Sequence, residues 1–118
     1  MNSDGSRETQ PIASNILNEV SVTRGSTEHM VLFELYVNDV YLTTVQGDGV
    51  LISTPTGSTA YNMSCGGSIV NANAQVISVT PICPHSLSFR PVILPLNCKI
   101  TIVLPQETRT DAWVTFDG

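Results

Sequence analysis

The sequence predicts one mainly β domain with a single short helix. Short runs rich in β-branched and aromatic residues recur between turn-forming residues. No segment keeps a helical spacing of apolar residues for more than a couple of turns. A chain of 118 residues, 42% of them hydrophobic, is also long enough for one compact core and too short for two ordinary domains.

The first expected elements form a hairpin that follows a polar N-terminal segment. Residues 1–16, which begin polar and aperiodic, indicate a flexible lead-in or a cloning boundary. Val31–Val37 and Val40–Val45 are strand-like runs, and the two turn-forming residues Asn38-Asp39 separate them. This spacing predicts a hairpin, although Asn-Asp is a poorer turn pair than Asn-Gly.

A second group of elements surrounds the expected helix. A sharp turn at Gln46–Gly49 leads to a buried strand at Val50–Ser53, and a loop of small residues follows at Thr54–Thr59. Ala60–Cys65 is expected to form the short helix, and Gly66-Gly67 stops it because glycine readily ends helices.

Three further strands are expected in the second half of the chain, at Gln75–Thr80, Lys99–Leu104 and Ala112–Phe116. Prolines confine the stretch after the first of these to loops and edge strands, because proline has no backbone N–H to donate. These prolines are Pro81, Pro84, Pro91 and Pro95. Asp117-Gly118 is a strong hairpin-turn dipeptide at the end of the chain, so we expect the natural protein to continue beyond it.

The charge pattern excludes several classes of function. The net charge is −5, and the five cations are scattered along the chain, whereas binding to a nucleic-acid backbone needs a concentrated basic face. One arginine can still hold a small anionic ligand. Only 13% of the residues are charged, against about a quarter in ordinary domains, which indicates that a partner or a missing domain covers part of the surface.

The cysteines and the apolar runs indicate an intracellular protein. Cys65, Cys83 and Cys98 are odd in number and form no Cys-x-x-Cys pair, so we expect buried, reduced thiols and no metal site. No apolar run approaches the roughly 20 residues of a membrane span, and the N-terminus lacks the apolar region of a secretory signal. We therefore expect a soluble, cytoplasmic protein without a membrane partner.

The segment Thr54–Tyr61 is the densest group of candidate binding residues. Small hydroxyl residues and a glycine let backbone amides approach a ligand closely. If Ser58 or Thr59 caps the helix, its N-terminus adds free N–H groups for a phosphate, and Tyr61 can stack on a planar base. An ordinary strand-to-helix connection explains the same residues equally well. No lysine follows the glycine, which excludes a Walker A phosphate loop.

Other polar residues have both a functional and a plain structural interpretation. Asp48, between two glycines, either presents an acid to a ribose hydroxyl or an amide, or serves its own turn. Asn18 and Glu19 can together bind two vicinal ribose hydroxyls, or form ordinary solvated surface. His85 is expected to make a structural hydrogen bond and Arg90 to pair with an internal acid. A Ser-His-Asp triad is excluded, because no serine has the required strand-turn-helix setting.

The order of these motifs resembles that of the NAD kinases. In chain order the motifs are LNEV (17–20), GDG (47–49), STPTGSTAY (53–61), GG (66–67) and TPICPHSLSFRP (80–91). The last of them, together with residues 113–118, is similar to eukaryotic rather than bacterial members. The resemblance covers roughly residues 17–118. NAD kinases transfer the terminal phosphate of ATP, or in some members of polyphosphate, to the 2′-hydroxyl of the adenosine ribose of NAD, which gives NADP.

The resemblance implies an architecture and a set of ligands. It implies a β-sandwich-like C-terminal domain, of the fold that NAD kinases share with diacylglycerol kinases, packed against a Rossmann-like N-terminal domain. It also implies a homo-oligomer, either a dimer or a tetramer. The full enzyme would use ATP with a divalent metal, Mg²⁺, and would take NAD as its substrate.

The resemblance also implies NAD-binding residues, position by position. The pair Asn18–Glu19 matches the residues that hold ribose hydroxyls, and Tyr61 matches the aromatic wall of the adenine-side pocket. Asp48 matches a turn near the nicotinamide end or near the ligand of a neighbouring subunit, and Asp117 matches the final turn. The implied NAD-binding residues are Asn18, Glu19, Asp48, Thr59, Ala60, Tyr61, Ser64 and Asp117.

One departure from the family pattern concerns catalysis. The family's Gly-Gly-Asp-Gly motif, whose aspartate is the proposed base, lies in the N-terminal domain, and here the only Gly-Asp-Gly follows Gln46. We therefore expect no catalytic residue in this fragment, no activity from it alone and at most weak ligand binding. The alternative is a non-catalytic nucleotide-binding or oligomerisation module of the same fold. A lipid kinase of the diacylglycerol-kinase superfamily is disfavoured, because the blocks at 54–61 and 81–86 would not be expected there together.

Overall fold

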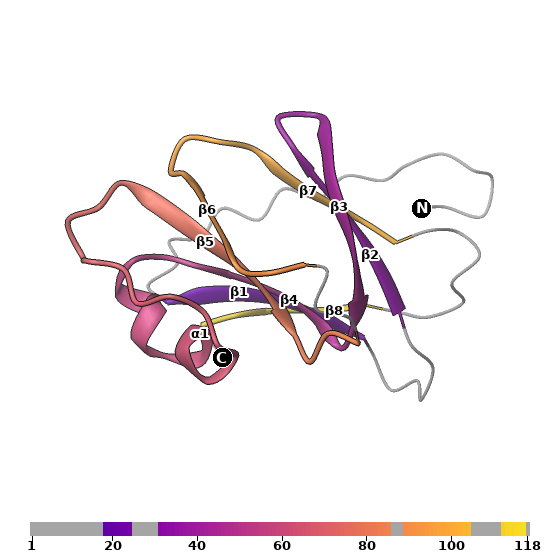
Figure 1. The fold of residues 1–118 in the computed structure, drawn as a ribbon, viewed down its shortest axis with the longest axis horizontal. Helices are drawn as coiled ribbons and strands as arrows, with labels where there is room; N and C mark the ends of the chain where they lie inside the picture. Colours follow the sequence, from indigo (N-terminus) through magenta and orange to yellow (C-terminus); the bar gives the residue numbers. More distant parts are fainter. Residues whose placement is uncertain (1–17, 25–30, 86–88, 105–111, 118) are drawn as a thin grey trace.

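The computed structural model describes residues 18–24, 31–85, 89–104 and 112–117, which form two antiparallel β-sheets (Figure 1). The lead-in expected at residues 1–16 lies outside the described residues. Sheet A has five strands in the order β6-β5-β4-β1-β8, and sheet B has three in the order β3-β2-β7. The strands are β1 (Glu19–Arg24), β2 (Val31–Val37), β3 (Val40–Gly47), β4 (Gly49–Ser53), β5 (Val76–Ile82), β6 (Val92–Pro95), β7 (Ile100–Val103) and β8 (Ala112–Phe116).

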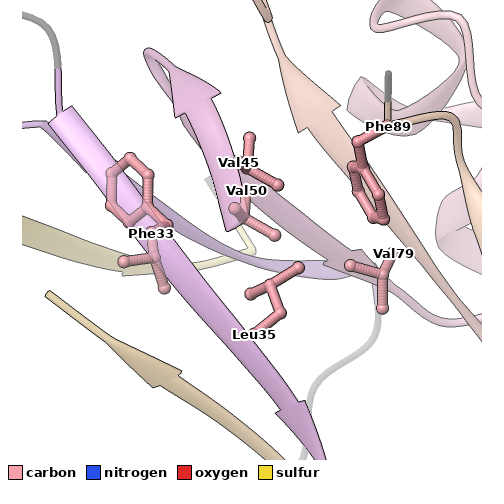
Figure 2. Close-up of a cluster of buried hydrophobic side chains, with 7 residues drawn as sticks. Phe33, Leu35, Val45, Val50, Val79 and Phe89 are labelled. Carbon is pink, nitrogen blue, oxygen red and sulfur yellow. The ribbon is translucent and has the colours of Figure 1, made fainter. Parts of the chain in front are cut away.

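The core lies between the two sheets, because alternate residues of each strand point to one face. In sheet B, Phe33 and Leu35 are buried on the inner face of β2, and Val50 and Val79 of sheet A belong to the same buried cluster (Figure 2). Val22 of β1 is also part of this cluster. Burying each of these side chains stabilises the fold by about 1.5–3 kcal/mol. In Figure 1, β2 and β3 run steeply across the strands of sheet A. The predicted mainly β domain is confirmed.

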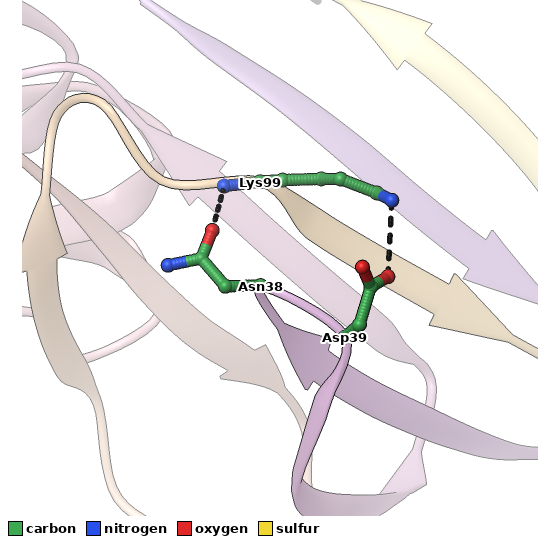
Figure 3. A network of polar contacts seen from close by, with 3 residues as sticks. All are labelled: Asn38, Asp39 and Lys99. Carbon is green, nitrogen blue, oxygen red and sulfur yellow. Dashed lines mark hydrogen bonds and ion pairs between the residues drawn. The ribbon is translucent and has the colours of Figure 1, made fainter.

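The predicted hairpin between β2 and β3 is confirmed. Asn38 and Asp39 both have positive φ angles, 50° and 67°, as the tight turns that suit the strand twist require. Lys99, the residue before β7, stabilises this turn from outside. Its backbone N–H donates to Asn38 Oδ1 at 2.9 Å, and its Nζ lies 3.0 Å from Asp39 Oδ1 (Figure 3). These contacts explain why Asn-Asp suffices where Asn-Gly is the commoner pair.

The prolines are placed partly as expected. Pro84 and Pro91 lie outside the strands, and Pro95 ends the edge strand β6. Pro81 is different, because it lies inside β5, an interior strand of sheet A. However, β6 pairs with β5 only at residues 76–79, so at Pro81 the strand has β4 on one side and no strand on the other among the described residues. Pro81 therefore lies in an interior strand, contrary to the expectation, but at a point where that strand pairs on one side only, as at a sheet edge.

The cysteines are free, but the expectation that they are buried is wrong. Cys65 and Cys98 are half-buried, and Cys83 is exposed with a positive φ of 47°. No helix within the described ranges is long and apolar enough to cross a membrane.

Candidate functional site

The outer face of sheet A is buried, and it carries several polar side chains beside the apolar Leu51 and Ile82. Since Val22, Val50 and Val79 face the core, the alternate residues of β1, β4 and β5 point away from it. Glu19, Ser53 and Ser78 are direct neighbours across β1, β4 and β5 and stand in a row on this outer face. All three are buried, as is Thr80 two residues further along β5. The hydroxyl groups of Ser53, Ser78 and Thr80 are thus shielded from solvent, unlike those on an ordinary solvated face of a sheet.

A short segment after β4 lies against this face. It consists of the 3₁₀ turn Thr56–Thr59, labelled η1, and the one-turn helix α1 (Tyr61–Ser64). The proposed cap by Ser58 or Thr59 is wrong: Ala60 occupies the cap position, and it makes no side-chain hydrogen bond to the helix. The Ser58 hydroxyl instead donates to Pro55 O at 2.7 Å and accepts from the Val70 N–H at 2.9 Å. The hypothesis of a phosphate held at the helix N-terminus therefore gains no support.

The carboxamide of Asn62 connects α1 to the sheet. Its Nδ2 donates to Ser68 O at 3.0 Å and to Ser58 O at 3.3 Å. Its Oδ1 accepts a hydrogen bond from Thr80 Oγ1 at 2.6 Å and a longer one from Ser78 Oγ at 3.5 Å. The amide is fully buried, so these bonds form away from competing water.

Three segments that are distant in sequence meet at the start of β1. Asp117 Oδ1 accepts hydrogen bonds from the backbone N–H groups of Asn18 at 2.6 Å and of Glu19 at 3.0 Å. Asn18 O accepts from the Thr54 N–H at 2.9 Å. Gly57 lies so close to Asn18 that an added Cβ would come within 2.6 Å of Asn18 Cα and closer still to its carbonyl group. The structure thus brings together Asn18, Glu19, Asp117 and the start of the Thr54–Tyr61 segment, at Thr54 and Gly57.

Glu19 carries the most unusual polar group of this cluster. Only 6% of the residue is exposed, and its Oε2 atom is buried without a hydrogen-bond partner among the described residues. Ser53 Oγ, directly across the strand pair, is in the same situation. A buried polar atom without a partner is costly, roughly 1–3 kcal/mol, and more when it is charged. Glu19 therefore has unused acceptor capacity, although its Oε2 atom is closed to solvent in this conformation.

Tyr61 lies at the surface beside the thiol of Cys65. Tyr61 is 41% exposed. Partial burial raises the pKa of Tyr61 above its ordinary value of 10.0, and the charges of Cys65, Cys83 and Asp48 raise it further. Burial also raises the pKa of Cys65. Both groups are therefore protonated near neutral pH, and Tyr61 offers a neutral ring for stacking.

The remaining predicted residues of this segment are accessible, as a binding role requires. Thr59 and Ser64 are exposed and Ala60 is half-buried, whereas Gly57, Ser58 and Asn62 are buried. The turn and helix therefore separate into a face that holds the fold and a face open to solvent.

Asp48 does not join the cluster around Glu19. It precedes β4, whereas Ser53, the partner of Glu19, ends the same strand. Asp48 Oδ1 lies 3.2 Å from Arg24 Nε, a partner that the sequence did not indicate. His85 is exposed, and its backbone N–H donates to Gln46 O. The ion pairs within the described part of the chain do not include Arg90, so its expected acidic partner is not confirmed.

Sequence reasoning missed Ser53, Asn62 and Thr80. Their only signal is the alternation of hydroxyl and apolar residues in β5, where Ser78 and Thr80 flank Val79. A serine or threonine face opposite a valine face indicates a sheet with something polar on its outer side. The sequence does not show that this partner is Asn62.

Two solved structures have the same two-sheet fold, which places the chain in the class of NAD kinase domains. The crystal structure of yeast NADH kinase complexed with NADH matches with a TM-score of 0.78 and 42% identity, over 86% of this chain and 29% of that chain. The NAD kinase from Archaeoglobus fulgidus in complex with ATP matches with a TM-score of 0.78 and 28% identity, over 87% of this chain and 39% of that chain.

Curated relatives agree with the structural matches. NAD kinase 2, chloroplastic, from Arabidopsis thaliana is 53% identical over 104 residues, and ATP-NADH kinase YEF1 from Saccharomyces cerevisiae is 50% identical over 104 residues. Each match covers 88% of this chain, which spans 11% and 21% of those relatives respectively. The family described as the ATP-NAD kinase C-terminal domain matches residues 17–118, and the chain belongs to this family. The predicted resemblance is confirmed.

Proposed function

We propose that this chain is the NAD-binding, C-terminal domain of an NAD kinase, which phosphorylates the 2′-hydroxyl of the adenosine ribose of NAD to give NADP. The observation that carries this proposal is the buried, unpartnered carboxylate oxygen of Glu19 beside the Thr54–Tyr61 segment. A ribose supplies hydroxyl donors for which a carboxylate is a strong acceptor. The yeast relative of known structure was crystallised with NADH, a ligand of the required kind.

Each candidate residue has a defined task in this proposal. Glu19 accepts hydrogen bonds from ribose hydroxyls, with Asn18 beside it, while Asp117 fixes the backbone of both residues through their N–H groups. Tyr61 stacks on the adenine ring, a contact worth roughly 1–3 kcal/mol by analogy with base–aromatic stacking. Thr59, Ala60 and Ser64 complete the adenine side.

Asp48 has a separate place in the proposal. Its ion pair with Arg24 lies at the opposite end of β4 from Ser53, so we assign it to the nicotinamide end or to the ligand of a neighbouring subunit. An assembly of two or four copies, a cytoplasmic location and ATP as phosphate donor are parts of the proposal that rest on the family resemblance.

The catalytic step requires residues beyond this domain. The only Gly-Asp-Gly of the chain carries Asp48, which belongs to the downstream block, so no residue here is assigned as the base. Within the described residues, no three His, Cys, Asp or Glu side chains come together to hold a metal. This part of the chain therefore offers no such cluster for Mg²⁺, and we derive no step through it. The fragment alone is expected to be inactive.

The test is a calorimetric titration of the isolated chain and of the complete protein with NAD and NADP. We expect binding by the complete protein and much weaker binding by the chain, because half of a cleft desolvates its ligand poorly. An absence of NAD binding by the complete protein would overturn the proposal. A complete protein that binds NAD but transfers no phosphate from ATP would instead favour the alternative of a non-catalytic nucleotide-binding or oligomerisation module.

A further inference from the structure

Asn62 is buried directly behind the proposed NAD-binding surface. The residue is 0% exposed, so its side chain is not available to a ligand in this conformation. Its neighbour Tyr61 is 41% exposed and belongs to the same single turn of helix. A helix of one turn has almost no intrinsic stability, because nucleation is unfavourable without tertiary contacts. The orientation of Tyr61 therefore depends on what holds this turn to the rest of the domain.

The Asn62 carboxamide hydrogen bonds to the chain before the helix, to the chain after it and to strand β5. Its two N–H hydrogens donate to Ser58 O, before the helix, and to Ser68 O, after it. Its oxygen accepts the 2.6 Å hydrogen bond from Thr80 on β5 of sheet A. Both hydrogens and the oxygen are in use, which is the full capacity expected of a well-placed buried amide. An aspartate lacks the donors, and a leucine lacks both kinds of group.

Gly67 shows how tightly the amide is enclosed. A Cβ at this position would come within 2.6 Å of Asn62 Nδ2 and closer still to its Oδ1. The Gly67 N–H also donates to the Asn62 backbone oxygen at 2.9 Å. The chain after the helix thus packs directly on the amide, and rotation of the side chain would break its hydrogen bonds.

We infer that Asn62 is a positioning residue for NAD, acting with Thr80 to fix the turn that carries Tyr61 relative to the sheet that carries Glu19. This inference rests on the proposed function. A surface that is ordered before binding loses less conformational entropy when the ligand arrives, and so binds more tightly. The buried amide supplies this order without contacting the ligand.

The first test replaces Thr80 rather than Asn62, because it removes one hydrogen bond of the amide and leaves the others in place. Thr80→Val in the complete protein keeps the branched shape and removes the 2.6 Å hydrogen bond. We expect the Kd and the KM for NAD to rise roughly tenfold, the scale of one buried hydrogen bond, with kcat and the KM for ATP unchanged. Thr80→Ser keeps the hydroxyl and is expected to restore the NAD affinity. The second variant, Asn62→Asp, keeps the size but places a charge against two carbonyl oxygens, so it should weaken NAD binding at least as much.

Val79→Ala is the matched control. Val79 is the neighbour of Thr80 on β5 but points into the core, so its truncation lowers stability without touching the Asn62 network. An NAD affinity that Thr80→Val leaves unchanged, while the Tm falls as far as in Val79→Ala, would show that Asn62 only stabilises the fold and would overturn the inference. If the unmodified complete protein binds no NAD, the proposed function itself fails, which is a different result.

Discussion

The contact between Gly57 and Asn18 gives a sharp prediction for the substitution Gly57→Ala. The new Cβ would clash most severely with the Asn18 carbonyl oxygen, so the loop has to move by about 1.5 Å to reach ordinary contact distance. This movement would break the Thr54 N–H to Asn18 O bond and strain the Gly57 N–H to Thr54 Oγ1 bond. Two hydrogen bonds at about 1 kcal/mol each, with an overpacking cost of about 1–3 kcal/mol, predict a loss of about 3–5 kcal/mol in the free energy of unfolding.

The assay is urea denaturation of the chain, followed by the fluorescence of Trp113, its only tryptophan. Gly66→Ala is the control, since a Cβ there meets nothing within 4 Å and the substitution suffers only from the positive φ of 81°. That conformational cost is about 1–2 kcal/mol. A smaller loss for Gly57→Ala than for Gly66→Ala would refute the argument from close packing.

Three further predictions concern ligand binding and pH. Tyr61→Ala should weaken NAD binding by roughly 1–3 kcal/mol in calorimetry of the complete protein, whereas Tyr61→Phe keeps the ring and should bind almost normally; unchanged affinity in the alanine variant would discredit the stacking role. Glu19→Gln should raise the KM for NAD and spare the KM for ATP, and an equal rise in both would contradict the ribose role. Because burial raises the pKa of Cys65, its contribution to stability is complete below the ordinary value of 9.0 and is lost as the pH rises through the folded-state pKa. The Tm should therefore fall more steeply above pH 9 in the parent chain than in Cys65→Ala, as thermal unfolding at several pH values would show.

The secondary-structure elements that the sequence predicted are those determined by residues close together in the chain. The hairpin at Asn38-Asp39 was predictable because two turn-forming residues between β-branched runs allow few other conformations. The strand Ala112–Phe116 was predicted with the bounds that the structure has. In contrast, β1 was not predicted, because its six residues EVSVTR include only two apolar ones. It is a strand because it pairs with β4 on one side and β8 on the other.

Long-range contacts explain what the sequence could not predict at the site. Ser58 has the chemistry of a helix cap, but its hydroxyl bonds to Val70, twelve residues away, and local propensity carries no information about that partner. The same holds for Asn62 and Thr80, which are 18 residues apart. The meeting of Asn18, Glu19 and Asp117 was implied only by the family resemblance, since nothing near either segment indicates the other.

The bond from Asp117 to the start of β1 has a consequence for synthesis of the protein in the cell. Asp117 follows Glu19 by 98 residues, so the ribosome must add nearly the whole domain before the Glu19 N–H can find its acceptor. At about 5–20 residues per second, the interval is roughly 5–20 s. Until β8 emerges, one flank of β1 lacks its neighbouring strand, and a nascent chain with an open strand edge is prone to pair with the wrong partner. The speed of translation between β1 and β8 therefore sets how long this strand edge stays open.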